Sequence, residues 1–218
     1  MSEDVTKKWL AEALGTGLLV ATVIGSGIMA ERLAGGNVAV ALLANTLATA
    51  AVLVTLIAVL GPVSGAHFNP WVTLSALWQG DLSRSSASAY ILAQFAGGVL
   101  GAVLANLMFD LPAITPSTHI RTGMGQWLGE FTATFGLLIV IRGIVRERAS
   151  ASPWVIAGWI TAAYWFTSST SFANVAVTFA RAWSDTFAGI RLVDVPGFAG
   201  AQLLGTIGGV WVGKKLWP

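Results

Sequence analysis

Cysteine is absent from the 218 residues of the chain, which excludes disulfide bonds, thiolate metal sites and thiol nucleophiles. The two histidines, His67 and His119, lie far apart in the sequence, so we expect no metal site. Charged residues make up only 10% of the chain, whereas an average soluble domain has about 25%. The formal net charge is only +2, and no basic stripe indicates a nucleic-acid partner. With 55% hydrophobic residues, the composition is that of an integral membrane protein.

Catalytic motifs are also missing. Serine, histidine and acidic residues occur, but none has the spacing of a nucleophile with its base, and there is no glycine-rich phosphate motif. We therefore expect a protein that is not an enzyme and that needs no cofactor.

Six apolar runs have the length needed to cross a bilayer, which is about 20 residues per helix. The first run, from about Trp9 to Ala30, is too long for the apolar part of a signal peptide, and further spans follow it. The sequence therefore predicts an all-α membrane protein that forms one domain over 1–218. Its six transmembrane helices are expected at about 8–31, 38–60, 86–108, 125–145, 153–169 and 196–215.

Two shorter apolar stretches begin with the same pattern. Asn69-Pro70-Trp71-Val72-Thr73-Leu74 aligns without a gap with Asn174-Val175-Ala176-Val177-Thr178-Phe179. Asparagine is a preferred N-cap, and proline at the first helical position costs nothing. Each run is too short to cross a bilayer, so each predicts a re-entrant half-helix that begins inside the membrane. Two such half-helices at matching places in two halves of a chain indicate a transport site.

The two halves of the chain, about 1–108 and 122–218, share further marks. Glu12 and Thr16 correspond to Glu130 and Thr134, and Gln94-x-x-Gly97-x-x-x-Gly101 corresponds to Gln202-x-x-Gly205-x-x-x-Gly209. Glycines four residues apart allow helix backbones to approach closely. Because each half has three spans, the halves must have opposite orientations in the membrane, which makes them an inverted repeat.

Lysine and arginine predict the orientation. With both termini in the cytoplasm, the outer side keeps four basic residues and the cytoplasmic side has the other eight, which agrees with the positive-inside rule. The outer four are Arg32, Arg121, Arg181 and Arg191, against Lys7, Lys8, Arg84, Arg142, Arg146, Arg148, Lys214 and Lys215. We expect a multi-pass protein of the cell membrane, the inner membrane in a bacterium, with the lipid bilayer as a partner.

The stretch Ser64-Gly65-Ala66-His67-Phe68-Asn69-Pro70, the inverted repeat and the two Glu-x-x-x-Thr marks resemble the major intrinsic protein (aquaporin) family over essentially the whole chain. The resemblance implies a homotetramer with a pore through each protomer, for water or small neutral solutes. The family normally carries Asn-Pro-Ala twice, whereas this chain has Asn69-Pro70-Trp71 and Asn174-Val175-Ala176 at the expected pore centre. Trp71 either fills a gap beside Val175 or narrows or plugs the pore.

The same resemblance implies a selectivity filter. The family usually has arginine three residues after the second asparagine, and this chain has Val177 there. The other filter positions, carried over by spacing, are Thr49, Ala162 and Ser171. Since all four are small and uncharged, we expect a wide, arginine-free filter. Arg181 lies one turn beyond Val177, and we expect it to pair with Asp185 or to reach water rather than to line the vestibule.

Three more residues are candidates for supporting the pore. By the resemblance, Glu12 and Glu130 accept hydrogen bonds from the backbone of the re-entrant loops. The alternative is a proton-coupled carrier that uses these two carboxylates, because intramembrane carboxylates are costly and often functional. His67 either forms a polar wall of the pore or fixes the backbone of its loop.

The sequence thus predicts a passive channel for water or small neutral solutes such as glycerol. The core Asn-Val-Ala-Val-Thr resembles bacterial members associated with arsenic resistance, which makes neutral metalloid acids candidate solutes. The alternative is a non-conducting, structural or adhesive membrane tetramer whose pore is blocked at Trp71.

Overall fold

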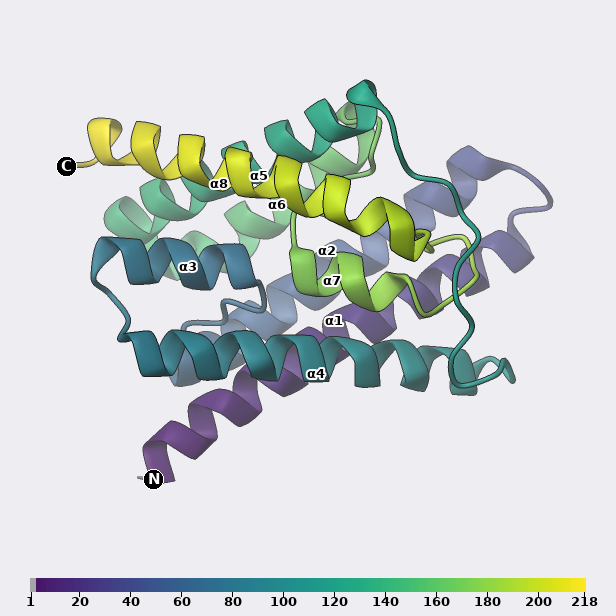
Figure 1. Cartoon of the computed structure of the whole chain (residues 1–218), viewed down its shortest axis with the longest axis horizontal. Helices are drawn as coiled ribbons and strands as arrows, with labels where there is room; N and C mark the ends of the chain where they lie inside the picture. Colours follow the sequence, from purple (N-terminus) through teal and green to yellow (C-terminus); the bar gives the residue numbers. More distant parts are fainter. Residues whose placement is uncertain (1–2) are drawn as a thin grey trace.

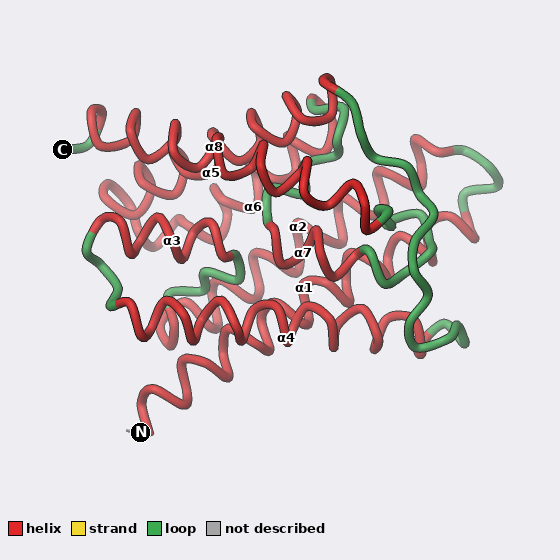
Figure 2. Tube along the Cα trace, in the orientation of Figure 1, coloured by secondary structure: helices red, strands yellow, loops and turns green. Residues whose placement is uncertain are grey.

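The computed structural model describes residues 3–218, and all regular secondary structure within these residues is helical (Figures 1 and 2). Eight α-helices and two short 3-10 helices follow one another along the described chain. They are α1 Glu3–Leu33, α2 Val38–Ser64, α3 Pro70–Gln79, α4 Arg84–Met108, α5 Met124–Arg148, η1 Ala149–Ala151, α6 Ser152–Phe166, α7 Val175–Arg181, η2 Leu192–Asp194 and α8 Val195–Leu216.

The long helices form the membrane-crossing part of the fold. Five stretches are long and apolar enough to cross a bilayer, and one of them, Met124–Phe166, contains both α5 and α6. The chain leaves the helical conformation between them at Arg148, with φ −154° and ψ 68°. Six transmembrane helices therefore result, as predicted. The fifth transmembrane helix, α6, ends at Phe166 rather than near residue 169, because the backbone of Thr167 is extended.

The two halves of the chain have the same packing, which confirms the inverted repeat. Helix α1 packs along α4, and α5 packs along α8. A Cβ atom added to Gly97 would lie 2.1 Å from the carbonyl oxygen of Ala13, and one added to Gly205 would lie 2.5 Å from that of Phe131. Glycine at these places brings the helix backbones into direct contact.

The re-entrant helices α3 and α7 lie between the two pairs of long helices (Figure 1). Both termini lie at one end of the bundle, and α3 runs toward that end, whereas α7 runs toward the opposite end. We call the end opposite the termini the distal end. The sequence predicted both half-helices and their starts at residues 70 and 175 correctly.

The segment 109–123 crosses the distal end between α4 and α5 (Figure 1). It is fixed to the chain that follows α7, because Ser117 N donates to Ala182 O at 2.9 Å and Thr118 N donates to Asp185 Oδ1 at 2.8 Å. These bonds place a connecting segment without regular secondary structure directly over the end of α7.

Candidate pore site

Asn69 and Asn174 begin α3 and α7 and bind across the molecule. Each is an N-cap in extended conformation, and its side-chain oxygen accepts backbone N–H groups of its own helix. Asn69 Nδ2 donates to Ala173 O at 2.8 Å, and Asn174 Nδ2 donates to Phe68 O at 2.7 Å. Each amide nitrogen carries two N–H donors, so one donor of each asparagine remains for a solute.

The two re-entrant loops have the same backbone shape. Three residues before each asparagine, Ala66 and Ser171 have φ of 50° and 52°, and one residue before, Phe68 and Ala173 have φ of 49° and 48°. Non-glycine residues at positive φ cost of order 1–3 kcal/mol each and cluster at functional sites. The fold therefore holds both loops in a strained shape.

Glu12 holds the first loop. Its two oxygens accept hydrogen bonds from Ser64 Oγ, His67 N, Phe68 N and Gln94 Nε2, at 2.7, 3.0, 2.7 and 2.7 Å. The carboxylate is fully buried, so these four donors replace its hydration.

Glu130 has the same role in the second loop. It accepts from Phe172 N at 2.8 Å, Ala173 N at 2.9 Å and Gln202 Nε2 at 2.6 Å. Neither Glu12 nor Glu130 is among the residues that line the cavity described below. Both carboxylates therefore support the backbone of the loops, and neither offers a proton path along the cavity.

Trp71 lies against α8 and outside the cavity lining. Its indole Nε1 donates to Gln202 Oε1 at 3.0 Å, and the indole does not line the cavity. Of the two placements that the sequence left open for Trp71, the contact with Gln202 is one of packing. Ala176 stands at the matching place in the second motif and has no side-chain donor. Gln94 corresponds to Gln202, and its Oε1 atom is buried without a hydrogen-bond partner in the described chain.

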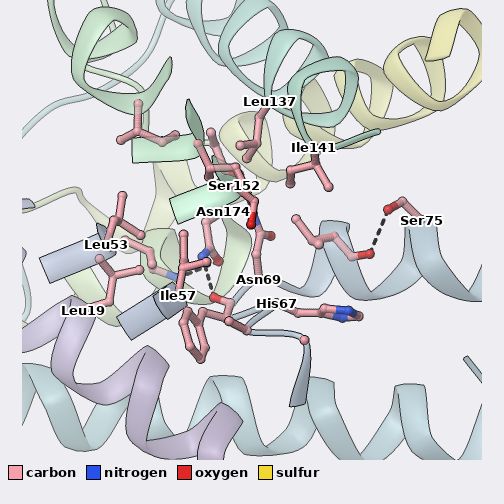
Figure 3. Close-up of a pocket in the computed structure, with 18 of the residues that line it drawn as sticks. Leu19, Leu53, Ile57, His67, Asn69, Ser75, Leu137, Ile141, Ser152 and Asn174 are labelled. Atoms are coloured by element: carbon pink, nitrogen blue, oxygen red, sulfur yellow. Dashed lines mark hydrogen bonds between the residues drawn. The ribbon is translucent and has the colours of Figure 1, made fainter. Parts of the chain in front are cut away.

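A cavity of about 500 Å³ passes beside the two asparagines. In Figure 3, Asn69 and Asn174 lie next to each other, with Leu53 and Ile57 on one side and His67 on the other. Toward the end with the termini, the cavity reaches Gln79, Asp81, Arg142 and Arg146. Toward the distal end it reaches Thr49, Tyr164, Ser171, Val177 and Arg181.

Three of the four predicted filter residues line this cavity, and one does not. Thr49, Ser171 and Val177 are lining residues. Ala162 is exposed on the outside of α6, so its assignment to the filter is wrong. The side chain that α6 contributes is Tyr164, which is 3% exposed and has its hydroxyl 3.4 Å from Thr49 Oγ1.

The structure also corrects the expectation that Arg181 pairs with Asp185 or reaches water. Asp185 does not bind it, because that carboxylate accepts from Thr118. Arg181 is 3% exposed, lies 3.4 Å over the ring of Phe172, donates from Nε to Ala188 O, and lines the cavity. The four filter positions thus lack arginine, but the cavity that Val177 lines contains a guanidinium group from the next turn.

A second cation, Arg121, lies over the same aromatic ring as Arg181. The guanidinium carbon of Arg121 is 5.1 Å from the centre of the Phe172 ring. Burial lowers the pKa of Arg121 to about 10, so this group remains charged at neutral pH. Partial burial, with Arg121 and Arg181 nearby, lowers the pKa of His119 on the same segment.

The sequence left two roles open for His67, a polar wall of the pore and a support of the backbone of its loop. His67 lines the cavity, and its Nδ1 lies 3.1 Å from Thr73 Oγ1 in α3. Its ring meets Tyr90 edge to face at 5.5 Å.

The sequence analysis missed Tyr164, which lines the cavity, and it missed that Gln202 binds Trp71 and Glu130. Ile156, Ile160 and Tyr164 repeat at four-residue spacing and all line the cavity, a periodicity that indicates the inner face of α6. For Gln202, the signal was a polar residue inside an apolar span, repeated as Gln94 in the other half.

Comparisons with known proteins show the family to which the chain belongs. The sequence pattern of the family described as Major intrinsic protein matches residues 1–168. The chain is 54% identical to the aquaglyceroporin AqpS of Rhizobium meliloti (strain 1021) over 204 residues, which covers 94% of this chain and 87% of that protein. It is 32% identical over 183 residues to a probable aquaporin, AqpM, of Archaeoglobus fulgidus, covering 76% of this chain and 73% of that one.

The fold also matches a solved structure, that of the aquaglyceroporin from Plasmodium falciparum. The TM-score is 0.70 at 19% identity, with 98% of this chain and 95% of that chain covered. With the paired re-entrant helices, the crossed asparagines and the matched sequence, this chain belongs to the major intrinsic protein family.

Proposed function

We propose that this protein is a passive membrane channel for water and small neutral solutes of the glycerol type. The observation that carries the proposal is the cavity along which both re-entrant loops present Asn69 and Asn174. Each asparagine offers one N–H donor to a solute oxygen there, and the walls made by Leu19, Leu53 and Ile57 bind no solute oxygen. Support also comes from the two sequence relatives, one an aquaglyceroporin and the other a probable aquaporin.

The filter that we propose differs from the one expected from spacing. Thr49, Tyr164 and Ser171 supply hydroxyl groups, Val177 supplies an apolar wall, and Arg181 supplies a cation. A lining with both hydroxyl groups and an apolar side chain suits a polyol, which has both polar and apolar faces. Neutral metalloid acids share the hydroxyl pattern and are a further solute class to test.

We further propose a single domain, a homotetramer in a bacterial inner membrane, and cytoplasmic termini. The positive-inside distribution of lysine and arginine supports the orientation. Exposed leucine and valine side chains on several helices, among them Leu10, Val59, Leu92 and Leu100, support burial in lipid or against other protomers.

Swelling of liposomes that contain the purified protein tests the function. Under an inward glycerol gradient, we expect the vesicles to swell several times faster than protein-free vesicles, and an osmotic gradient gives the same comparison for water. Arsenous acid serves as a third solute. Rates equal to those of empty vesicles for all three solutes would reject the channel and favour the structural, non-conducting alternative.

A further inference from the structure

Arg181 is held so that part of its guanidinium group has no protein partner. The Nε atom donates to Ala188 O, and the plane lies over Phe172. Within residues 3–218, no hydrogen bond involves the two terminal nitrogens, although the residue is only 3% exposed. The side chain lines the cavity, so its unpartnered donors belong to the cavity surface.

No carboxylate forms an ion pair with Arg181 in the described part of the chain. Glu130 is close enough to interact electrostatically with both Arg181 and Arg121, but its oxygens bind Phe172 N, Ala173 N and Gln202 Nε2. In the described part of the chain, Asp194 forms an ion pair with Arg191, and Asp185 binds Thr118. Arg121, on the same Phe172 ring, donates to the neutral carbonyl groups of Gly189 and Phe187. Two buried guanidinium groups thus share one aromatic ring with Glu130 as the one carboxylate that acts on both, so a bound anion would stabilise this pair of cations.

A second unsatisfied group lies on the same loop. Ser171 Oγ is buried and has no hydrogen-bond partner among the described residues, and Ser171 lines the cavity next in sequence to Phe172. A buried hydroxyl without a partner costs free energy that a ligand oxygen would recover. Val177, a short side chain one turn before Arg181, lines the same cavity.

We propose that Arg181 and Ser171 form a binding site for one small oxyanion of the carboxylate class at the distal end of the cavity. A guanidinium group with two free terminal nitrogens matches the two oxygens of a carboxylate, and the charge-assisted bonds are about twice as strong as neutral ones. The hydroxyl of Ser171 adds a donor. The inference rests on the proposed function only in that the site lies on the solute path, so that a bound anion obstructs glycerol.

Formate is the probe. Glycerol swelling of proteoliposomes is measured with sodium formate at equal concentration on both sides, against sodium gluconate at matched ionic strength, because gluconate is larger. We expect formate to slow glycerol flux in a saturable way. In Arg181→Gln the half-inhibiting concentration should rise at least about tenfold, equivalent to about 1.4 kcal/mol. Arg181→Lys, which keeps the charge but loses the fork, should fall between the two.

Arg146→Gln is the matched control, since it removes a cavity-lining cation at the other end and should leave formate inhibition unchanged. Saturation-transfer NMR of formate on the purified protein gives a readout that does not need flux. No formate effect beyond that of gluconate, or equal inhibition in Arg181→Gln, would overturn the site while leaving the channel in place. Absent glycerol and water flux with formate still bound through Arg181 would reject the channel and keep the site.

Discussion

At the scale of single residues, the departure of this chain from Asn-Pro-Ala has a structural explanation. The indole of Trp71 reaches Gln202, which in turn donates to Glu130 and Thr178. Glu130 holds the backbone of the second re-entrant loop. A residue of the first motif therefore helps to position the loop of the second motif, through a hydrogen bond that spans 131 positions in the sequence.

The first prediction separates the bulk of Trp71 from its N–H group. Trp71→Phe keeps an aromatic ring but leaves Gln202 Oε1 without a donor, which should cost about 1–3 kcal/mol of stability. Trp71→Ala adds a cavity beside α8 and should cost more, about 3–5 kcal/mol. Thermal unfolding in detergent measures both. If Trp71→Ala instead raised glycerol flux strongly at unchanged stability, the ring would belong to the pore and not to packing.

The second prediction concerns the side chain that α6 gives to the filter. Tyr164 is buried on the cavity wall, whereas Ala162 is exposed on the outside of the same helix. Tyr164→Ala should widen the distal constriction and raise glycerol flux several-fold relative to water flux. Ala162→Val, the control on the opposite face, should change neither flux. The reverse pattern in the swelling assay would restore the assignment made from spacing.

At the scale of helices, close backbone approach fixes how the two halves are built. Gly97 and Gly101 of α4 face α1, and Gly205 and Gly209 of α8 face α5. Such contacts replace the hydrophobic driving force that lipid does not provide between helices. They also bring Gln94 and Gln202 within reach of Glu12 and Glu130, so helix packing and loop geometry are coupled.

The third prediction uses two glycines of α8. A Cβ atom at position 205 would lie 2.5 Å from Phe131 O, whereas one at position 200 would have no atom within 4 Å. Gly205→Ala should therefore separate α8 from α5, lower the melting temperature and reduce glycerol flux. Gly200→Ala should be neutral or stabilise the protein by up to about 1 kcal/mol, since alanine favours the helix. Equal effects of both substitutions would show that backbone contact is not the cause.

At the scale of the whole molecule, the structure favours diffusion over coupled transport. Both intramembrane carboxylates bind backbone amides of loops and stand outside the cavity lining. Coupling also needs two arrangements of the chain, and the crossed bonds of Asn69 and Asn174 tie the two halves together at the centre.

The fourth prediction follows from that arrangement. Glycerol should enter proteoliposomes at the same rate with and without a proton gradient, and its final concentration should equal the outside concentration. The measurement is uptake of labelled glycerol under an imposed pH difference, with a protonophore as the control. Accumulation above the outside concentration that the protonophore abolishes would contradict the passive channel and return Glu12 and Glu130 to consideration as proton carriers.

The sequence alone determined the class, the helices and the internal repeat of this protein. Apolar length, missing charge and the duplicated asparagine motif are local or periodic properties, and each has a direct structural consequence in a bilayer. The starts of α3 and α7 follow from the N-cap chemistry of Asn69 and Asn174, and the close helix contacts follow from the glycine spacing.

Only the tertiary structure decided which side chains form the distal end of the cavity. Spacing carried over from the family resemblance selected Ala162, but an α-helix repeats every 3.6 residues, so an offset of two residues places a side chain on the other face. The reach of Arg181 depends on Phe172 and Ala188, and the place of Trp71 depends on Gln202. Such contacts join segments that no local pattern relates, because they exist only once the helices have packed.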